Sequence, residues 1–343
     1  MRPAGGLARL LRNLAMMRCS PRRASSERLE MKYFIKKTVS MIITLLIVSF
    51  LMFLVFEIIP GDAAVSKLGT EATPEQVERY RESMGLNDPV PVRYARWLAG
   101  YLHGDFGTSA KYDRPVAGLL SDKLTVTLFL AVESFLLIFF ISIPLGVLVA
   151  KYSGKAFGRI SHLLMQIIMA IPSFFTGILL VFIFGITLKM FTPYRFVAPG
   201  DSFFGFLGCL FPAAVAIALP KIATVVRFLK QSVTSEERQD YVRTAYSKGA
   251  SSNRVYFLHI LKNAMIPVTT ILGMILAEVM AGSIVIEQVF NLPGLGRFLV
   301  SSIGSRDFPV VSAIMLYMAA VVIIINNLVD ILYHVVDPRI QND

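Results

Sequence analysis

The chain has 343 residues, of which 55% are hydrophobic and only 17% are charged, and its formal net charge is +11. Soluble domains carry nearer a quarter of charged residues, so this composition excludes an ordinary soluble domain and indicates a bilayer as solvent. The only cysteines, Cys19 and Cys209, stand far apart and lack metal-ligand spacing, which excludes a disulfide framework and a zinc site.

A basic segment precedes the first apolar run. Residues 1–30 hold seven arginines against Glu27 and Glu30, and they contain no apolar stretch long enough for a signal-peptide core. This composition fits a transit peptide, but we expect translation to begin at Met31. In either case we expect residues 1–30 to be a disordered extension.

Six stretches of the chain are long and apolar enough to cross a hydrocarbon core of about 30 Å, which needs roughly 20 residues per helix. In chain order they are residues 38–56, 124–150, 160–188, 203–226, 264–286 and 310–336. Four prolines inside them are expected to kink their helices: Pro144, Pro172, Pro212 and Pro220. We therefore predict an all-α polytopic membrane protein with six transmembrane helices.

The link between the first two stretches, residues 60–123, is long and mixed in charge, with eight basic and nine acidic residues. Thr73 is predicted to begin a helix, because its side chain and that of Gln76 can form a capping box. A second helix over 92–102 holds the only tryptophan, Trp97, for which a membrane-interface position and packing within the link fit equally well. We expect a partly helical outer loop without a separate domain.

Basic residues concentrate in alternate links, which predicts the orientation. Residues 1–37 carry ten basic residues against two acids, residues 151–159 three against none, and residues 227–262 seven against three. These links and both termini are therefore placed in the cytoplasm, and three links outside: 60–123, 189–208 and 288–309. Because this topology explains the surplus charge, we predict membrane lipids and no nucleic acid among the binding partners.

The most informative cytoplasmic stretch is residues 236–267, which read as a helix, a glycine break and a second helix. The first helix is expected to end before Gly249, which adopts a left-handed conformation without a Cβ penalty. Ser251 or Ser252 is expected to cap the second helix. Such an ordered elbow would present a compact basic knob to a cytoplasmic partner.

Two short motifs lie in this stretch: Tyr-x-Arg-Thr-Ala-x-x-Lys-Gly from Tyr241 and His-x-Leu-Lys-Asn-Ala-x-x-Pro from His259. In them the chain resembles the permease subunits of binding-protein-dependent ABC importers, and most closely the dipeptide, oligopeptide and nickel branch, which has arginine in place of Lys262. The general family motif starts with Glu-Ala-Ala, so Arg243 and Thr244 depart from it. The residues that fit the branch pattern are Tyr241, Arg243, Thr244, Ala245, Lys248, Gly249, His259, Leu261, Asn263, Ala264 and Pro267.

The resemblance extends over nearly the whole chain from Met31. Five further blocks follow in the order that the family shows: residues 59–62, 103–107, 293–297, 306–309 and 337–339. The long first outer loop and the block His-Gly-Asp-Phe-Gly at residues 103–107 resemble the first, B-type, member of the two permeases that such systems pair.

The resemblance implies a type I ABC importer transmembrane domain over residues 31–343, in the inner membrane of a bacterium, with residues 236–267 as the coupling segment. It implies three kinds of partner, namely a second homologous permease, two cytoplasmic ATPase subunits and an extracytoplasmic substrate-binding protein. The chain has no GxxxxGK[ST] motif, so ATP and Mg²⁺ are expected on the ATPase subunits and no cofactor on this chain. The residues expected to couple to the ATPases are Tyr241, Arg243, Thr244, Ala245, Lys248, Gly249 and His259.

Di- or oligopeptides are the substrates that the resemblance favours, and nickel or a nickel chelate is the alternative. A secondary transporter working alone is less supported, because we find no inverted repeats. We predict no catalytic residues and no metal ligands, because no nucleophile–base set or metal-ligand spacing occurs.

Three ionisable residues lie at membrane depth, where charge is costly and marks either a cavity or a paired contact. Glu133, Lys221 and Glu278 could line a polar translocation path, or Lys221 could pair with one of the two acids. Three polar residues of the last stretch are expected to hydrogen-bond between helices: Asn326, Asn327 and Asp330.

Overall fold

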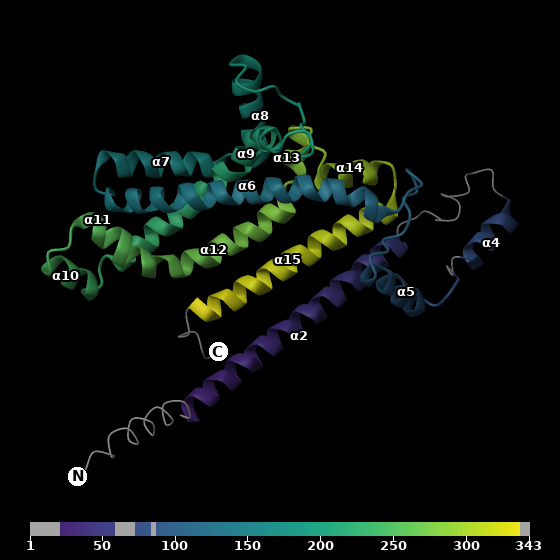
Figure 1. Ribbon diagram of the computed structural model, residues 1–343, viewed down its shortest axis with the longest axis horizontal. Coiled ribbons are helices and arrows are strands. Elements are labelled where there is room, and N and C mark those ends of the chain that lie inside the picture. The colour runs from purple at the N-terminus through teal and green to yellow at the C-terminus, as the bar shows by residue number, and fades with distance from the viewer. Residues whose placement is uncertain (1–20, 59–72, 84–86, 337–343) are drawn as a thin grey trace, which may run out of the picture.

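The computed structural model describes residues 21–58, 73–83 and 87–336, and all of its named elements are helices (Figure 1). Five helical segments are long and apolar enough to cross a membrane: Phe34–Ile58 within α2 (Pro21–Ile58), α6 (Val116–Lys151), α9 (Phe203–Glu236), Ser252–Met280, and Phe308–Ile331 within α15 (Phe308–Val336). The segment Ser252–Met280 runs through α11 (Ser252–Arg254), η2 (Val255–Ile260) and α12 (Leu261–Gly282). These helices lie side by side, as the prediction of an all-α membrane protein requires.

The third predicted span, residues 160–188, is bent at Pro172 as expected, but the bend is much sharper than a kink within one helix. The structure divides it into α7 (Ala156–Ala170), α8 (Ser173–Leu180) and the π-helix η1 (Val181–Thr187), and the two parts meet at an angle of 99°. Pro172 disfavours helical geometry at the residue before it, and Ile171 is extended with φ −89° and ψ 121°. The described residues thus contain six membrane spans if the bent pair is counted as one span, and five without it.

The structure describes only the last third of the extension expected over residues 1–30. Residues 1–20 lie outside the described residues, whereas residues 21–30 are helical and continue without interruption into the first span. Proline suits the first turn of a helix, and no glycine or proline follows between Arg22 and Lys37 to end it. The helix therefore begins at Pro21.

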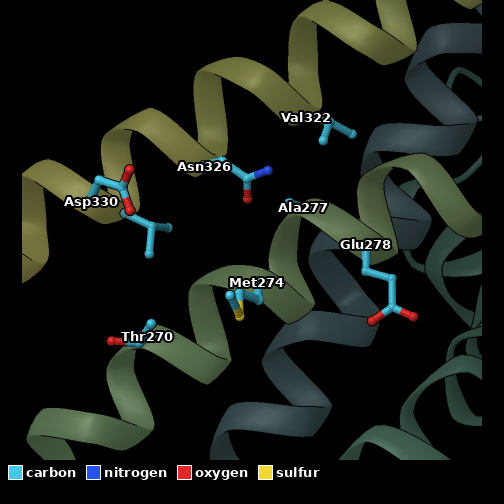
Figure 2. Close-up of a pocket in the computed structure, with 8 residues that line it drawn as sticks. Thr270, Met274, Ala277, Glu278, Val322, Asn326 and Asp330 are labelled. Carbon is cyan, nitrogen blue, oxygen red and sulfur yellow. The ribbon is translucent and has the colours of Figure 1, made fainter. Parts of the chain in front are cut away.

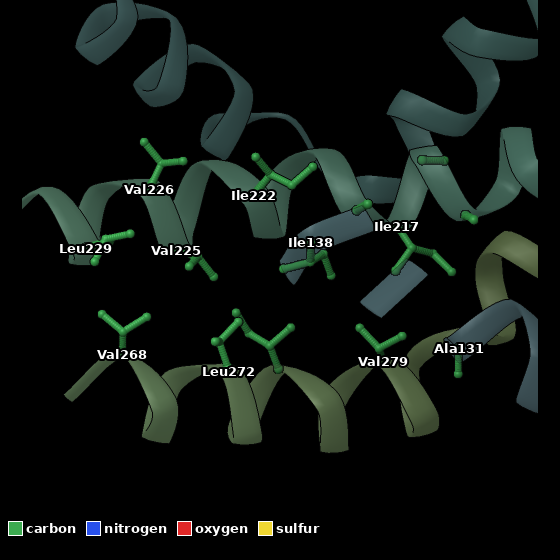
Figure 3. Close-up of a cluster of buried hydrophobic side chains, with 14 of the residues drawn as sticks. Ala131, Ile138, Ile217, Ile222, Val225, Val226, Leu229, Val268, Leu272 and Val279 are labelled. Carbon is green, nitrogen blue, oxygen red and sulfur yellow. The ribbon is translucent and has the colours of Figure 1, made fainter. Parts of the chain in front are cut away.

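The core lies between α6, α9 and α12. Figure 3 shows Ile138 of α6 between Leu272 and Val279 of α12 and the facing residues of α9, all of them buried. Lipid tails are as apolar as these side chains, so close packing rather than removal from water holds the helices together. The positions at which two helices are in close contact are therefore the most sensitive to substitution.

Gly273 of α12 lies directly against Val329 of α15, and a Cβ atom built on it would overlap both methyl groups of Val329. We expect Gly273→Ala to lower the free energy of unfolding by about 1–3 kcal/mol, as overpacking does. Val329→Ala in the same chain should restore most of that loss. Thermal unfolding of the purified variants measures both effects, and a double variant no more stable than Gly273→Ala would contradict this packing.

The described part of residues 60–123 packs against the first and last spans, and its lack of a separate domain stays a prediction. α4 (Pro74–Ser83) begins with the predicted capping box, in which Thr73 N donates to Gln76 Oε1 at 3.0 Å. In α5 (Val90–Leu102) the Trp97 ring lies 4.2 Å from that of Tyr101 and 5.8 Å from that of Phe53 on α2. Trp97 thus packs within the outer loop and against the first span.

Buried polar contacts fix this outer layer to the rest of the chain. Asp307, between α14 (Leu295–Gly304) and α15, is fully buried and accepts hydrogen bonds from the Ser109 hydroxyl and from the Ala110 N–H at 3.1 Å. Arg93 of α5 makes two bonds of 2.6 and 2.7 Å to Glu57 at the end of α2. The loop is therefore anchored on both α2 and α15.

Candidate coupling segment and intramembrane polar residues

The elbow that the sequence predicted is present, between α10 (Asp240–Ser247) and α11. Gly249 has φ +78°, its N–H donates to Tyr246 O at 2.9 Å, and Ala250 N–H donates to Ala245 O at 3.2 Å. These two bonds make a Schellman motif, which satisfies the last carbonyl groups of α10. The predicted left-handed glycine is confirmed; Ser251 occupies the N-cap position of α11, but its side chain makes no capping bond.

Two tyrosines fasten the elbow to the end of α9. Tyr241 Oη donates to Glu236 Oε2 at 2.7 Å, and Tyr256 Oη donates to Glu237 Oε1 at 2.6 Å. Partial burial, and then the Glu236 carboxylate, raise the pKa of the Tyr241 phenol, so it keeps its proton and remains a donor at neutral pH. Val242 is buried in the core beside them, so α10 is attached firmly to the bundle.

The predicted coupling residues divide into two groups by exposure. Tyr241 and Ala245 are partly buried and pack against the core. The others are exposed: Arg243, Thr244, Lys248, Gly249 and His259. The elbow also exposes three large apolar side chains that sequence reasoning did not single out, Tyr246, Phe257 and Leu258, of which Leu258 is 63% exposed. The outward face of the elbow is therefore both basic and apolar.

The structure brings together two of the three ionisable residues at membrane depth. Lys221 of α9 forms an ion pair with Glu278 of α12, which is one of the two arrangements left open by the sequence. Glu133 of α6 lies elsewhere, in the neighbourhood of Cys209 of α9, and Cys209 is twelve residues, or roughly 18 Å of helix axis, from Lys221. The Oε2 atom of Glu133 is buried and has no hydrogen-bond partner among the described residues.

A pocket of about 600 Å³ lies between α12 and α15 (Figure 2). Its lining residues are Thr270, Met274, Ala277, Glu278, Val322, Asn326, Val329 and Asp330. Glu278 thus borders the pocket on one side, and Asn326 and Asp330 border it from the last span. Neither Glu133 nor Lys221 is among the lining residues.

The polar residues of the last span mostly make the expected contacts between helices. Asp330 forms an ion pair of 2.6 Å with Lys37 of α2, and Asn327 Nδ2 donates to Lys37 O at 3.2 Å. Both predictions are confirmed. Asn326 lines the pocket instead, and Figure 2 shows its side chain pointing from α15 toward α12.

The Lys221–Glu278 pair can be tested by a double-mutant cycle. We expect Lys221→Glu and Glu278→Lys each to destabilise the protein, because each replaces an ion pair with two like charges in contact. The double reversal should recover about 0.5–3 kcal/mol of unfolding free energy relative to the sum of the single changes. Strictly additive losses in thermal unfolding would show that the two side chains do not interact.

Sequence reasoning missed Glu287, which is fully buried in α13 (Ile284–Val289), one residue beyond the predicted fifth span. Its Oε1 accepts hydrogen bonds from Thr127 of α6 at 2.8 Å and from Ser283 at 2.9 Å. Its Oε2 accepts from the backbone N–H of Arg297 at 3.0 Å. The run of Asn, Leu, Pro and Gly that follows it at 291–294 is the only sequence signal of a tight return of the chain.

Glu287 joins three elements at the end of the bundle where α6 begins: α6, α13 and the start of α14. Thr127 Oγ1 also accepts from Leu295 N–H at 2.8 Å, so the hydrogen bonds form a closed network. Burial raises the pKa of Glu287, although the hydroxyl and backbone donors oppose this effect.

Among the described residues, no group of three or more His, Cys, Asp or Glu side chains could hold a metal ion.

Comparison with known proteins covers almost the whole chain. Residues 142–342 match the family described as "Binding-protein-dependent transport system inner membrane component", and residues 30–131 match the N-terminal family of such membrane components. A Brucella abortus protein named for a peptide transport system permease is 38% identical over 90% of this chain and 98% of its own length.

Two further relatives are similar over the same extent. The oligopeptide transport system permease protein AppB of Bacillus subtilis is 36% identical over 90% of this chain and 99% of its own length. The glutathione transport system permease protein GsiC of Salmonella paratyphi A is 34% identical over 91% of this chain and 99% of its own length.

Proposed function

The chain belongs to the family of inner membrane components of binding-protein-dependent transport systems, the permease subunits of ABC importers, and on this premise we propose that it imports di- or oligopeptides. The observation that carries the substrate class is the full-length similarity to permeases named for peptide, oligopeptide and glutathione transport. Glutathione is itself a tripeptide. None of these three relatives is named for nickel, so the nickel alternative is not favoured.

We propose that the permease acts in an assembly with a second homologous permease, two cytoplasmic ATPase subunits that bind ATP and Mg²⁺, and an extracytoplasmic substrate-binding protein. The exposed residues of the elbow would contact an ATPase subunit: Arg243, Thr244, Lys248, Gly249 and His259. Tyr241 and Ala245 would hold α10 in place behind this surface. We propose that this chain is the first, B-type, permease of the pair, because residues 60–123 resemble the first outer loop of that member.

The fold suggests how movement at the elbow would reach the membrane. From Ser252 to Gly282 the chain continues through α11, η2 and α12 without a break, a length of roughly 46 Å at the rise of a helix. Displacement of α10 would therefore shift α12, whose Glu278 borders the pocket and pairs with α9. Two positions of α12, favoured by different states of the ATPases, would give alternating access.

We propose that the pocket between α12 and α15 borders the translocation path and that Lys221 holds the Glu278 carboxylate in position there. The pocket is large enough for a small peptide and carries polar groups on both walls. Glu133 does not line it, and its place on the path stays a prediction.

We propose that the protein lies in a bacterial inner membrane with both termini and the elbow in the cytoplasm. The distribution of basic residues supports this orientation. Lys151, in one of the three basic links, contacts Asn253 in the elbow, so two of these links lie at the same end of the bundle.

The decisive experiment is reconstitution of the permease with its companion subunits in proteoliposomes. We expect ATP-dependent accumulation of a labelled di- or tripeptide once the binding protein is present. Labelled Ni²⁺ is the parallel substrate, and its accumulation without that of peptides would overturn the peptide assignment. Peptide transport by this chain without ATPase subunits would instead indicate a secondary transporter.

A further inference from the structure

The link between α6 and α7 gathers basic side chains around one aromatic ring. Lys151 ends α6, Lys155 immediately precedes α7, and Arg159 follows one helical turn later, whereas residues 151–159 contain no acid. The Nζ atoms of Lys151 and Lys155 each lie 5.1 Å from the centroid of the Tyr152 ring. Two ammonium groups thus converge on one side chain, which attracts cations through its ring face.

The described chain does not neutralise this charge. Lys151 contacts Asn253, a neutral residue of the elbow, and Arg254 beside Asn253 adds another cation at this end of the bundle. None of the ion pairs among the described residues includes any of these four basic side chains. Within the described residues the cluster is therefore a basic surface without an acidic partner, and such a surface attracts anionic groups.

An apolar stripe on α7 begins at the same place. Its members follow one another at intervals of three and four residues, so they share one side of the helix, and each is between 47% and 58% exposed: Phe157, Ile160, Leu164 and Ile167. α7 lies along the outside of α6, near the end that carries the elbow (Figure 1). The stripe therefore presents an apolar surface directly beside the basic cluster.

We propose that the α7 surface, defined as Lys151, Lys155, Arg159 and the apolar stripe, binds an anionic phospholipid. The phosphate would lie at the two lysine ammonium groups, and the acyl chains would run along the stripe. The continuity of the two features favours a lipid over a soluble anion or an ATPase subunit, since neither of these would cover an apolar face at membrane depth. Basic clusters at the cytoplasmic ends of membrane helices select anionic headgroups in this way.

The test is native mass spectrometry of the purified full chain with its companion subunits, titrated with phosphatidylglycerol, phosphatidylcholine or inorganic phosphate. We expect tighter binding of phosphatidylglycerol than of phosphatidylcholine. Replacing both lysines, in Lys151→Gln/Lys155→Gln, should weaken phosphatidylglycerol binding on the order of ten-fold at low salt and less at high salt. A photoreactive phosphatidylglycerol should cross-link to peptides of α7.

The outer end of the chain offers a matched control. Lys111 lies 5.3 Å from the Tyr112 ring, and Lys189 is also exposed, so Lys111→Gln/Lys189→Gln removes the same charge outside the α7 surface and should leave lipid binding unchanged. Lys151→Arg/Lys155→Arg keeps the charge and should keep the binding, which guards against a mere folding defect. Equal weakening by the control pair, equal binding of both lipids, or displacement of the lipid by millimolar phosphate would overturn the proposal.

Discussion

Gly249→Val is expected to reduce ATP-dependent peptide uptake more than ten-fold while the assembled transporter continues to hydrolyse ATP. Gly249 has φ +78°, a conformation that is unfavourable for L-residues by roughly 1–2 kcal/mol and is worse for a β-branched side chain. No atom lies within 4 Å of the position of its Cβ, so the substitution creates no clash within the described chain. The valine would instead distort the end of α10 and the contact with the ATPase that we propose there.

Gly104 is a matched control, because it closes the same kind of turn at the opposite end of the molecule. Its φ is +80°, its N–H donates to Tyr101 O, Asp105 N–H donates to Gly100 O, and no atom lies within 4 Å of its Cβ position. Gly104→Val therefore carries the same backbone strain and should leave ATP hydrolysis coupled to uptake.

Asparagine tolerates the left-handed conformation better than valine does, so Gly249→Asn should keep most of the uptake. Uptake and ATP hydrolysis are measured together in proteoliposomes. Coupled transport by Gly249→Val at the level of the unaltered protein would refute the role of the elbow, whichever substrate is carried.

Glu287→Ala is expected to destabilise the permease by about 2–5 kcal/mol, the largest loss of stability that we predict for a single change. The substitution leaves the Thr127 and Ser283 hydroxyls and the Arg297 N–H without their acceptor in a buried site, and it opens a cavity. Thermal unfolding of the purified assembly measures the effect. Glu82, an exposed residue of α4, is the control, and Glu82→Ala should change little.

Gly294 gives an independent approach to the same site. A Cβ at Gly294 would overlap the Glu287 carboxylate, so Gly294→Ala should also destabilise the protein although it removes no hydrogen-bonding group. If Glu287→Ala and Gly294→Ala both unfolded at the temperature of the unaltered protein, the buried network around Glu287 would not exist as described.

Glu287 should also make stability depend on pH. Because burial raises its pKa in the folded state, the folded protein keeps this proton to a higher pH than the unfolded chain does. The stabilisation that comes from binding this proton is complete below the pKa of glutamate in the unfolded chain, about 4.3. It is lost as the pH rises through the higher pKa of Glu287 in the folded protein. Glu287→Gln cannot titrate, so its unfolding temperature should show less decline over this range; identical pH profiles would contradict the prediction.

Several features could be predicted from neighbouring residues alone. Long apolar runs with at most one charged residue located most of the spans, the Thr73–Gln76 pair marked a helix start, and Gly249 marked the turn of the elbow. Each depends on hydropathy or on backbone hydrogen bonds that close within a few residues. The structure confirms all three.

Other predictions failed or stayed open because they depend on contacts between distant segments. Pro144, Pro212 and Pro220 lie inside continuous helices, whereas at Pro172 the chain turns by 99°, and the residue type does not distinguish them. Whether a proline breaks a membrane helix depends on which neighbours satisfy the freed backbone groups.

The sequence alone determined that the chain is helical, crosses the membrane repeatedly and carries an ordered basic elbow, because these properties arise from residues close together in the chain. Only the tertiary structure decided that Lys221 pairs with Glu278 and not with Glu133, and that Glu287 is buried among donors from three segments. The physical reason is range: ion pairs and buried hydrogen bonds act over a few ångströms, and the helices that bring these residues within reach lie dozens of positions apart in sequence.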